Sequence, residues 1–357
     1  MEYTKLKYIN EYVSESINPM RMPDTVFEMY SVPIYETGHP EYLRGDEIAS
    51  NKFIVRKNDV LLCKINPRIN RVWVVADESE HENIASSEWI VVRTSKYNPE
   101  FLAWYFRTPR FQRLMVSEVT GIGGSLTRAQ PKAVAEYPVP ILSRKEQDAI
   151  VRVLNRVHSV MDSRKKEMQK LDELIKARFV EMFGDPVSNS FGLPVKKLSD
   201  LGSLDRGRSQ HRPRNAPELL GGPYPLIQTG EVSAAGLYIT EYHNTYSEIG
   251  LKQSKMWKAG TLCITIAANI AQTAIMTFDA CFPDSVVGFV PYDEVNALYI
   301  HYWFSFFQKI LEDQAPQVAQ KNINLKILSN LNVVVPEKKT LKLFEDFVSQ
   351  VDKSKVA

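Results

Sequence analysis

The sequence presents one order of segments twice, and this repeat constrains the fold more than any other feature. An aromatic run at 101–106 is followed by a strand-like segment at 137–140 and then by a helix-forming segment. The second half has the same order, with an aromatic run at 299–304 and a strand-like segment at 333–336. Since the separation between corresponding segments is nearly constant, we predict two copies of one domain.

Both copies are expected to be rich in β-structure upstream of the aromatic run. Residues 58–62 in the first copy and 259–263 in the second are turn residues that lead into apolar segments typical of strands. With 357 residues, the chain has room for about two domains of roughly 150 residues each. The interiors of the copies differ, so we expect them to bind different ligands. A duplication retained only for packing is the alternative.

Residues 144–183 carry the clearest helix signal in the chain. Apolar side chains follow alternating steps of three and four, the spacing of a coiled-coil seam, at Leu154, Val157, Met161, Met168, Leu171, Ile175 and Met182. Arg164 and Arg178 interrupt that seam. A helix of about 40 residues is about 60 Å long and cannot be buried in a small domain. Gly184 and Pro186 mark its end.

Such a seam needs a partner helix. The candidate within the chain is the segment 341–356, which would pack antiparallel to the central helix, and a helix of a second chain is the alternative. The sequence therefore predicts an α+β fold. It has two β-rich domains in tandem repeat at 1–143 and 185–337, a long coiled-coil-type helix at 144–184, and a short C-terminal partner helix at 338–357.

Patterns typical of catalytic and metal sites are absent from the sequence. Cys63, Cys263 and Cys281 form no Cys-x-x-Cys pair, and the six histidines are scattered singly. Neither a phosphate-binding Gly-x-x-x-x-Gly-Lys-Ser/Thr loop nor a Gly-x-Ser-x-Gly nucleophile turn occurs. Nothing at suitable spacing around Asp279 and Asp284 suggests a nuclease metal cluster. These absences predict a chain that binds no cofactor or metal and is not itself an enzyme.

The sequence also lacks export and membrane signals. Its first residues contain no apolar leader segment, and no run approaches the ~18 apolar residues of a membrane helix. Because no disulfide framework is suggested either, we expect a cytoplasmic protein.

Basic and amide-rich loops are the remaining functional signal. The 44 Lys and Arg against 42 Asp and Glu give a net charge of +2, so DNA binding would depend on local basic patches. Arginine can read guanine and Asn or Gln adenine, while lysine mostly neutralises phosphate. The predicted DNA contacts in the two copies are Arg68, Asn70, Arg71, Arg128, Lys132, Arg206, Arg208, Arg212, Arg214, Gln228, Asn269, Gln272, Lys321 and Asn322. For any one loop the alternative is a solvated surface that binds no ligand. Because basic loops recur in both copies, we favour binding to double-stranded DNA.

The sequence resembles the specificity subunit of type I restriction-modification systems. The resemblance rests on the repeat, on the end of the central helix at 171–186 and on the terminal segment at 344–355. It implies two target recognition domains, each reading one half of a bipartite DNA site, and helices that set the gap and dock the modification subunits. Those subunits would carry S-adenosylmethionine and methylate flipped adenine at N6, and a separate restriction subunit would cut DNA using ATP.

The terminal segment departs from that family, in which the distal helix is about as long as the central one. A short helix would leave Met168, Leu171 and Ile175 uncovered, at a loss of ~25 cal/mol per Å² of apolar surface. We therefore expect another chain, either a modification subunit or a second copy of this protein, to cover them. Two other hypotheses stay open: a stand-alone nuclease or methyltransferase fused to recognition domains, and an assembly adaptor that does not read DNA.

Overall fold

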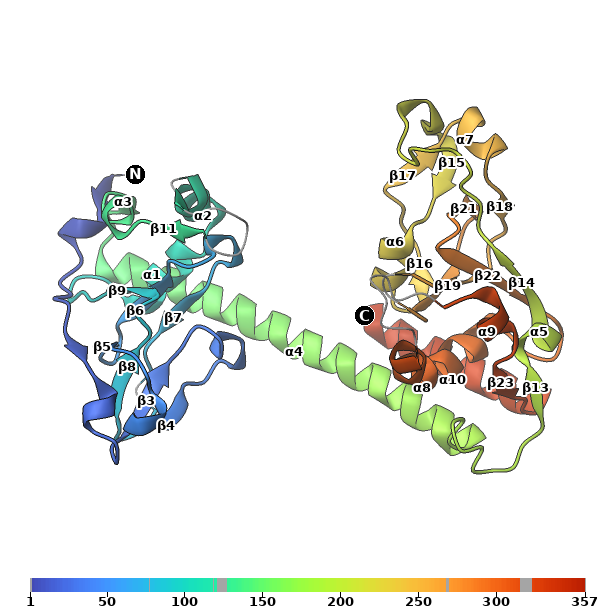
Figure 1. Cartoon of the computed structure of the whole chain (residues 1–357), viewed down its shortest axis with the longest axis horizontal. Helices are drawn as coiled ribbons and strands as arrows, with labels where there is room; N and C mark the ends of the chain where they lie inside the picture. The colour runs from blue at the N-terminus through green and yellow to red at the C-terminus, as the bar shows by residue number, and fades with distance from the viewer. Residues whose placement is uncertain are drawn as a thin grey trace. The chain divides into compact units, whose positions relative to one another are not determined.

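The computed structural model describes residues 2–76, 78–117, 119–120, 127–267, 270–314 and 323–356. Within them, helix and sheet are mixed, and the chain divides into two compact units at residues 1–163 and 164–357. A central helix, α4 (Arg144–Phe183), runs without a break, and a short helix, α10 (Lys338–Val356), lies at the C-terminal end (Figure 1). The predicted α+β class, with a long central helix and a short C-terminal one, is confirmed.

The first unit is built on two small sheets. One has the strand order β2-β5-β8-β3-β4, with β2 (Ser16–Ile17), β5 (Lys52–Ile54), β8 (Glu82–Ala85), β3 (Val26–Tyr30) and β4 (Glu41–Arg44). The other has the order β7-β6-β9, with β7 (Val72–Val74), β6 (Val60–Cys63) and β9 (Trp89–Val92). Two antiparallel pairs complete the unit: β1 (Tyr3–Lys5) with β12 (Pro138–Pro140), and β10 (Val119–Thr120) with β11 (Arg128–Ala129).

Helices cover the second of these sheets. They are α1 (Pro99–Phe106), α2 (Pro109–Ser117) and α3 (Pro131–Val134). The side chain of Asn98 caps α1 by accepting hydrogen bonds from the backbone N–H of Glu100 and of Phe101, the role that favours Asn at this position. The aromatic face of α1 then packs on β6, where every residue is buried. The expected strand after residue 58 is therefore present.

The second unit repeats and enlarges this plan. Its main sheet has the order β14-β22-β19-β20-β16, with β14 (Gly202–Arg206), β22 (Val286–Pro291), β19 (Leu262–Thr265), β20 (Thr273–Met276) and β16 (Tyr238–Ile239). A second sheet has the order β17-β15-β21-β18, with β17 (Asn244–Tyr246), β15 (Leu220–Leu226), β21 (Ala280–Cys281) and β18 (Met256–Trp257). β13 (Val195–Lys197) pairs with β23 (Asn332–Val334), as β1 pairs with β12.

The helices of the second unit are α5 (Leu198–Leu201), α6 (Thr229–Ala234), α7 (Glu248–Lys252), α8 (Ala297–Gln314) and α9 (Leu325–Ser329), besides α10 and the second half of α4. Short 3-10 turns occur at Leu6–Tyr8, Pro19–Arg21, Tyr35–Thr37, Gly45–Glu47, Pro67–Ile69 and Pro217–Leu219. No helix in the described part of the chain is both long and apolar enough to cross a bilayer.

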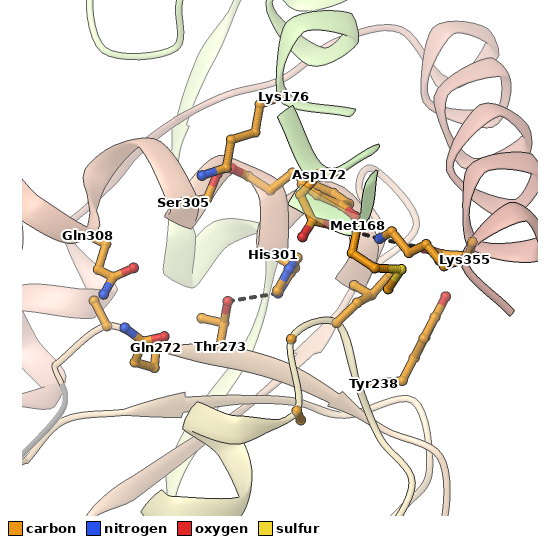
Figure 2. A pocket seen from close by; sticks show the side chains of 16 residues that line it. Met168, Asp172, Lys176, Tyr238, Gln272, Thr273, His301, Ser305, Gln308 and Lys355 are labelled. Carbon is orange, nitrogen blue, oxygen red and sulfur yellow. Dashed lines mark hydrogen bonds and ion pairs between the residues drawn. The ribbon is translucent and has the colours of Figure 1, made fainter. Parts of the chain in front are cut away.

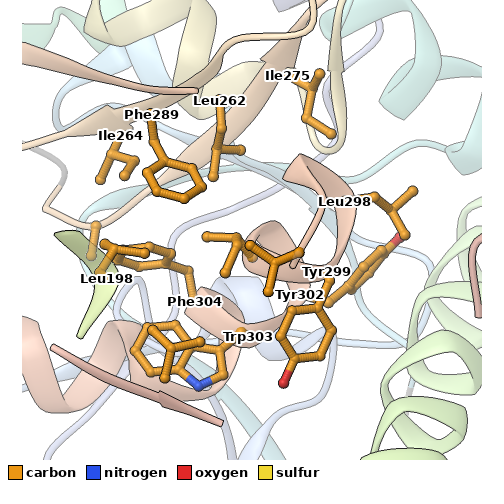
Figure 3. Close-up of a cluster of buried hydrophobic side chains, with 14 of the residues drawn as sticks. Leu198, Leu262, Ile264, Ile275, Phe289, Leu298, Tyr299, Tyr302, Trp303 and Phe304 are labelled. Atoms are coloured by element: carbon orange, nitrogen blue, oxygen red, sulfur yellow. The ribbon is translucent and has the colours of Figure 1, made fainter. Parts of the chain in front are cut away.

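The core of the second unit joins its sheet to three helices. Side chains of β19 and β22 pack against the aromatic run of α8, as Figure 3 shows for Leu262, Phe289 and Phe304. Phe344 of α10 extends this core and lies edge-on to Phe183 of α4, with ring centroids 5.3 Å apart. The core therefore includes the central helix.

The central helix and α10 run antiparallel in this core, as predicted for the terminal segment. Phe183, near the end of α4, meets Phe344, near the start of α10. At the other end of the contact, Lys355 Nζ lies 2.8 Å from Asp172 Oδ1, so the order of contacts is reversed.

The expectation that the seam from Met168 to Ile175 lacks a partner in its own chain is wrong. Ile175 is fully buried in the second-unit core, and Leu171 packs against it. Met168 is half-buried. Besides α10, helix α8 packs against α4 one turn further on: the ring of Phe306 in α8 lies 5.2 Å from that of Phe179 in α4.

Candidate nucleic-acid interface

The same junction of loops recurs in each unit at one end of an antiparallel strand pair, β6 with β7 in the first unit and β19 with β20 in the second. In the first unit, Lys64 N donates to Glu88 O (3.0 Å) and Ala129 N donates to Lys64 O (2.9 Å). In the second, Ile266 N donates to Ser285 O (3.0 Å) and Ile323 N donates to Ile266 O (3.0 Å). In the first unit these bonds connect the loop after β6 to the loop before β9 and to the segment at Ala129. In the second unit they connect the loop after β19 to the loop before β22 and to the segment at Ile323. The repeat in the sequence is thus a repeat of backbone hydrogen bonding.

The first-unit loop between β6 and β7 carries the predicted contacts Arg68, Asn70 and Arg71. Arg68 is exposed on the turn Pro67–Ile69. Asn70 is held inside the unit: its Nδ2 donates to Arg107 O (3.1 Å), and its Oδ1 accepts from Gln112 Nε2 (2.6 Å). Arg71 is half-buried, and its Nε has no hydrogen-bond partner within the described structure. Of these three side chains, Arg68 is the most accessible.

Arg128 enters the same junction from the neighbouring loop and is held by a carboxylate. Its Nε and Nη2 donate to the two carboxylate oxygens of Glu88, each at 3.2 Å. The hydrogen bond that Arg128 donates to Glu88 raises the pKa of Arg128 above its ordinary value, so the guanidinium stays charged. Lys132, close by in sequence on α3, is exposed.

The four arginines of the second-unit loop after β14 have different surroundings. Arg206 Nε and Nη2 donate to the backbone carbonyl of Asp284 at 3.0 and 2.7 Å. Arg214 Nη2 lies 2.6 Å from Asp284 Oδ1, and Arg212 Nη2 lies 3.8 Å from Asp284 Oδ2. Arg208 is exposed and has no hydrogen-bond partner for its side chain in the part of the chain that the structure describes. Three of these arginines therefore converge on one residue.

The predicted amide contacts are only partly brought together. Gln272 ends the loop between β19 and β20, where its backbone N donates to Thr265 Oγ1 (3.1 Å). Gln228 lies in another loop, at the start of α6, and its backbone N donates to Glu231 Oε2 (3.1 Å). Asn269, Lys321 and Asn322 lie outside the described residues. Ile323, which directly follows Asn322, is bonded to the same junction as described above.

A cavity of about 530 Å³ in the second unit lies beside Gln272 (Figure 2). His301 Nδ1 and Thr273 Oγ1 lie 2.9 Å apart in its wall, and burial lowers the pKa of His301 to about 4. Lys355 Nζ bridges Asp172 (2.8 Å) and Asp352 (3.0 Å) at the rim. At neutral pH the imidazole is therefore uncharged, and the ion pairs join α4 to α10. The cavity lies where α4, α8 and α10 meet the main sheet of the second unit.

Among the residues that the structure describes, no three His, Cys, Asp or Glu side chains lie close enough together to hold a metal ion. Asp279 is paired with Lys258 at 2.7 Å, and Asp284 with arginine. Both carboxylates therefore serve ion pairs.

The predicted partner-binding seam of α4 has two parts with different exposure. In the first unit, Val157 and Met161 are 51% and 64% exposed, and Leu154 is half-buried. Val153 and Val160, which the sequence prediction left out, are 62% and 58% exposed and widen this stripe. Because Val153 and Val160 lie three to four residues from Val157, helical periodicity could have assigned them to the same face. In the second unit, Leu171, Ile175 and Met182 belong to the core or pack against it.

Comparison with known proteins identifies this arrangement. Residues 192–357 match the family described as the type I restriction modification DNA specificity domain. The second half of the chain is therefore similar to that domain. The predicted resemblance to specificity subunits of type I restriction-modification systems is therefore confirmed.

Two solved structures extend the likeness over 99% of this chain. One belongs to a study of complex assembly and conformational transition of a type I R-M system, with 18% identity, 90% of that chain covered and a TM-score of 0.53. The other is the S subunit of the type I restriction-modification system from M. genitalium, with 13% identity, 92% of that chain covered and a TM-score of 0.53. At these identities the likeness concerns the fold, including the tandem arrangement of the specificity family.

Sequence reasoning missed the acidic residues that pair with these arginines. Glu88 lies just before β9 and Asp284 just before β22, and each pairs with an arginine. Asp284 lies 70 residues from Arg214 in sequence, so no local pattern links the two.

Proposed function

We propose that this chain is the non-catalytic specificity subunit of a type I restriction-modification complex. Each recognition unit would read one half of a bipartite DNA site. The helices would set the gap between the half-sites and dock adenine-N6 methyltransferase subunits. In this division of labour, residues 1–143 and 185–337 are the recognition domains, 144–184 the spacer and 338–357 the distal helix.

The observation that supports this proposal most is the repeated loop junction. Each copy places a guanidinium group on the loops of that junction, with Arg128 in the first unit and Arg206 to Arg214 in the second. Guanidinium forks match phosphate oxygens and the guanine edge. Because the net charge is only +2, such local groups must provide most of the attraction to DNA.

Docking of modification subunits is supported by the uneven burial of α4. Its second half is covered by α8 and α10, whereas Val153, Val157, Val160 and Met161 expose an apolar stripe in the first half. A partner helix with an apolar face would remove this stripe from water, as in a coiled coil. We assign that role to the modification subunits, which would contribute S-adenosylmethionine and the methyl-transfer chemistry. A restriction subunit would join the same complex.

One observation favours a second candidate, the assembly adaptor without DNA reading. Arg128, Arg206, Arg212 and Arg214 are engaged within the chain, so their donors are not free in this state. We favour DNA recognition because these contacts lie at the surface, where ion pairs contribute little and are readily exchanged. An adaptor would tolerate neutralisation of all four side chains without loss of DNA affinity.

Genome-wide methylation mapping tests the proposal. The chain is co-expressed with its modification subunit, and N6-methyladenine is mapped by single-molecule sequencing, with a strain that lacks this chain as control. A split motif with a fixed gap, found only when the chain is present, is the expected result. Absence of new methylation in a strain where the two proteins co-purify would refute DNA reading and leave the adaptor. Methylation or cleavage by the purified chain alone would instead support an enzyme.

A further inference from the structure

Asp284 contacts the guanidinium groups of three arginines in the second-unit loop after β14. It lies on the turn before β22, and its carboxylate pairs with Arg214 at 2.6 Å and approaches Arg212 at 3.8 Å. Its backbone carbonyl accepts two hydrogen bonds from Arg206. One residue thus binds Arg206 and Arg214 at hydrogen-bond distance, much as a phosphate would. Arg212 is held more loosely by the carboxylate, and its Nη1 donates to the backbone carbonyls of Ser209 (2.5 Å) and His211 (2.9 Å).

This contact can be exchanged. The side chain of Asp284 is 36% exposed, and those of Arg212 and Arg214 are 56% and 46% exposed. Ion pairs in such surroundings are screened by water and salt, so they hold a side chain in place without fixing the fold. A phosphate that brings the same charge and geometry can therefore take over the arginines.

The first unit contains a corresponding contact. Glu88 precedes β9 and accepts two hydrogen bonds from Arg128, each at 3.2 Å. The backbone carbonyls of Glu88 and of Ser285, next to Asp284, accept the equivalent junction bonds in the two units. A carboxylate that restrains an arginine at this junction is therefore a repeated feature of the chain.

We propose that Asp284 is a specificity-determining residue, which competes with DNA phosphates for Arg212 and Arg214. DNA must displace the carboxylate before these arginines contribute. On non-specific DNA that displacement opposes binding, whereas at the target half-site the base contacts outweigh it. The inference rests on the proposed function and adds to it a source of discrimination outside the base-reading side chains.

Removal of the charge should strengthen non-specific binding most. Each additional phosphate contact steepens the dependence of log affinity on log salt by about 0.9, which corresponds to about tenfold in affinity at 0.1 M salt. For Asp284→Asn we expect non-specific affinity to rise about tenfold, a steeper salt slope by about one unit, and a smaller ratio of specific to non-specific affinity. The backbone contact to Arg206 would remain.

The experiment measures binding of the full chain to labelled DNA duplexes by fluorescence anisotropy. KCl is varied from about 50 to about 300 mM, because affinity that depends on phosphate contacts changes strongly over this range. One duplex carries the motif found by methylation mapping and the other is scrambled. Asp293→Asn is the matched control, because Asp293 is exposed, belongs to the same unit and makes no ion pair among the described residues. It changes the net charge equally.

An arginine double variant, tested with and without Asp284→Asn, distinguishes the proposed competition from a structural effect of Asp284→Asn. Arg212→Gln with Arg214→Gln should lower non-specific affinity little in the wild-type background and about tenfold in the Asp284→Asn background. Equal affinity and slope for Asp284→Asn and Asp293→Asn, or an equal loss in both backgrounds, would overturn the inference. Failure of the wild-type chain to bind either duplex at any salt concentration would instead overturn the proposed function.

Discussion

Replacement of Phe344 by alanine tests how the second unit holds the central helix. Phe344 is fully buried, and its ring lies 5.5 Å from Phe179, 5.3 Å from Phe183 and 5.5 Å from Tyr302. Truncation of a buried Phe to Ala costs about 3–5 kcal/mol, because apolar contact is lost and a cavity remains. The three edge-on ring contacts place this site toward the upper end of that range. We expect the free energy of unfolding of the second unit to fall by about 4 kcal/mol.

The neighbouring residue supplies a matched control. Leu343 lies on the same helix and is 54% exposed, so Leu343→Ala should change stability by less than about 0.5 kcal/mol. Scanning calorimetry of the full chain is the assay, because the two units can give separate transitions and a single free energy would not describe both. The transition assigned to the first unit should not move. A loss below about 1 kcal/mol for Phe344→Ala, or equal losses for both variants, would refute the packing of α10 on α4.

Three further predictions concern the helices and the buried histidine. Insertion of one helical turn, about 5.4 Å, after Met161 should change the gap between methylated half-sites while their sequences stay the same; a change of sequence would contradict the spacer role. Glu at both Val157 and Met161 should prevent co-purification of the modification subunit without a change in melting, because both side chains are exposed, and retained co-purification would exclude this docking face. Burial lowers the pKa of His301 to about 4, below the value near 6.5 in the unfolded chain, so the second unit should lose stability as the pH falls from about 6.5 to 4. His301→Gln, which can still bond to Thr273, should lose less stability over that interval, and identical pH profiles for wild type and variant would refute the assignment.

The positions of the loops could be predicted from the sequence, but their pairing could not. The four arginines from Arg206 to Arg214 stand out because they lie within nine positions of the chain, and the structure places their loop beside the repeated junction. Their common partner, Asp284, comes from a distant loop and is one acidic residue among 42. Likewise Asn70 looks like a base-reading amide by composition, whereas in the fold both ends of its side chain bond within the unit. Side-chain chemistry identifies possible contacts, and the tertiary arrangement decides which of them are already used.

The sequence by itself determined the elements whose signals are local or repeated. The spacing of apolar side chains predicts α4, and the near-constant separation of the two copies predicts the duplicated domain, since helical periodicity and repetition need no knowledge of distant contacts. Only the tertiary structure decided which part of the seam is buried. Ile175 and Met161 occupy the same apolar stripe, yet Ile175 is fully buried and Met161 is 64% exposed. The reason is physical: burial depends on whether α8 and α10, more than a hundred residues later in the chain, pack over a given turn of the helix.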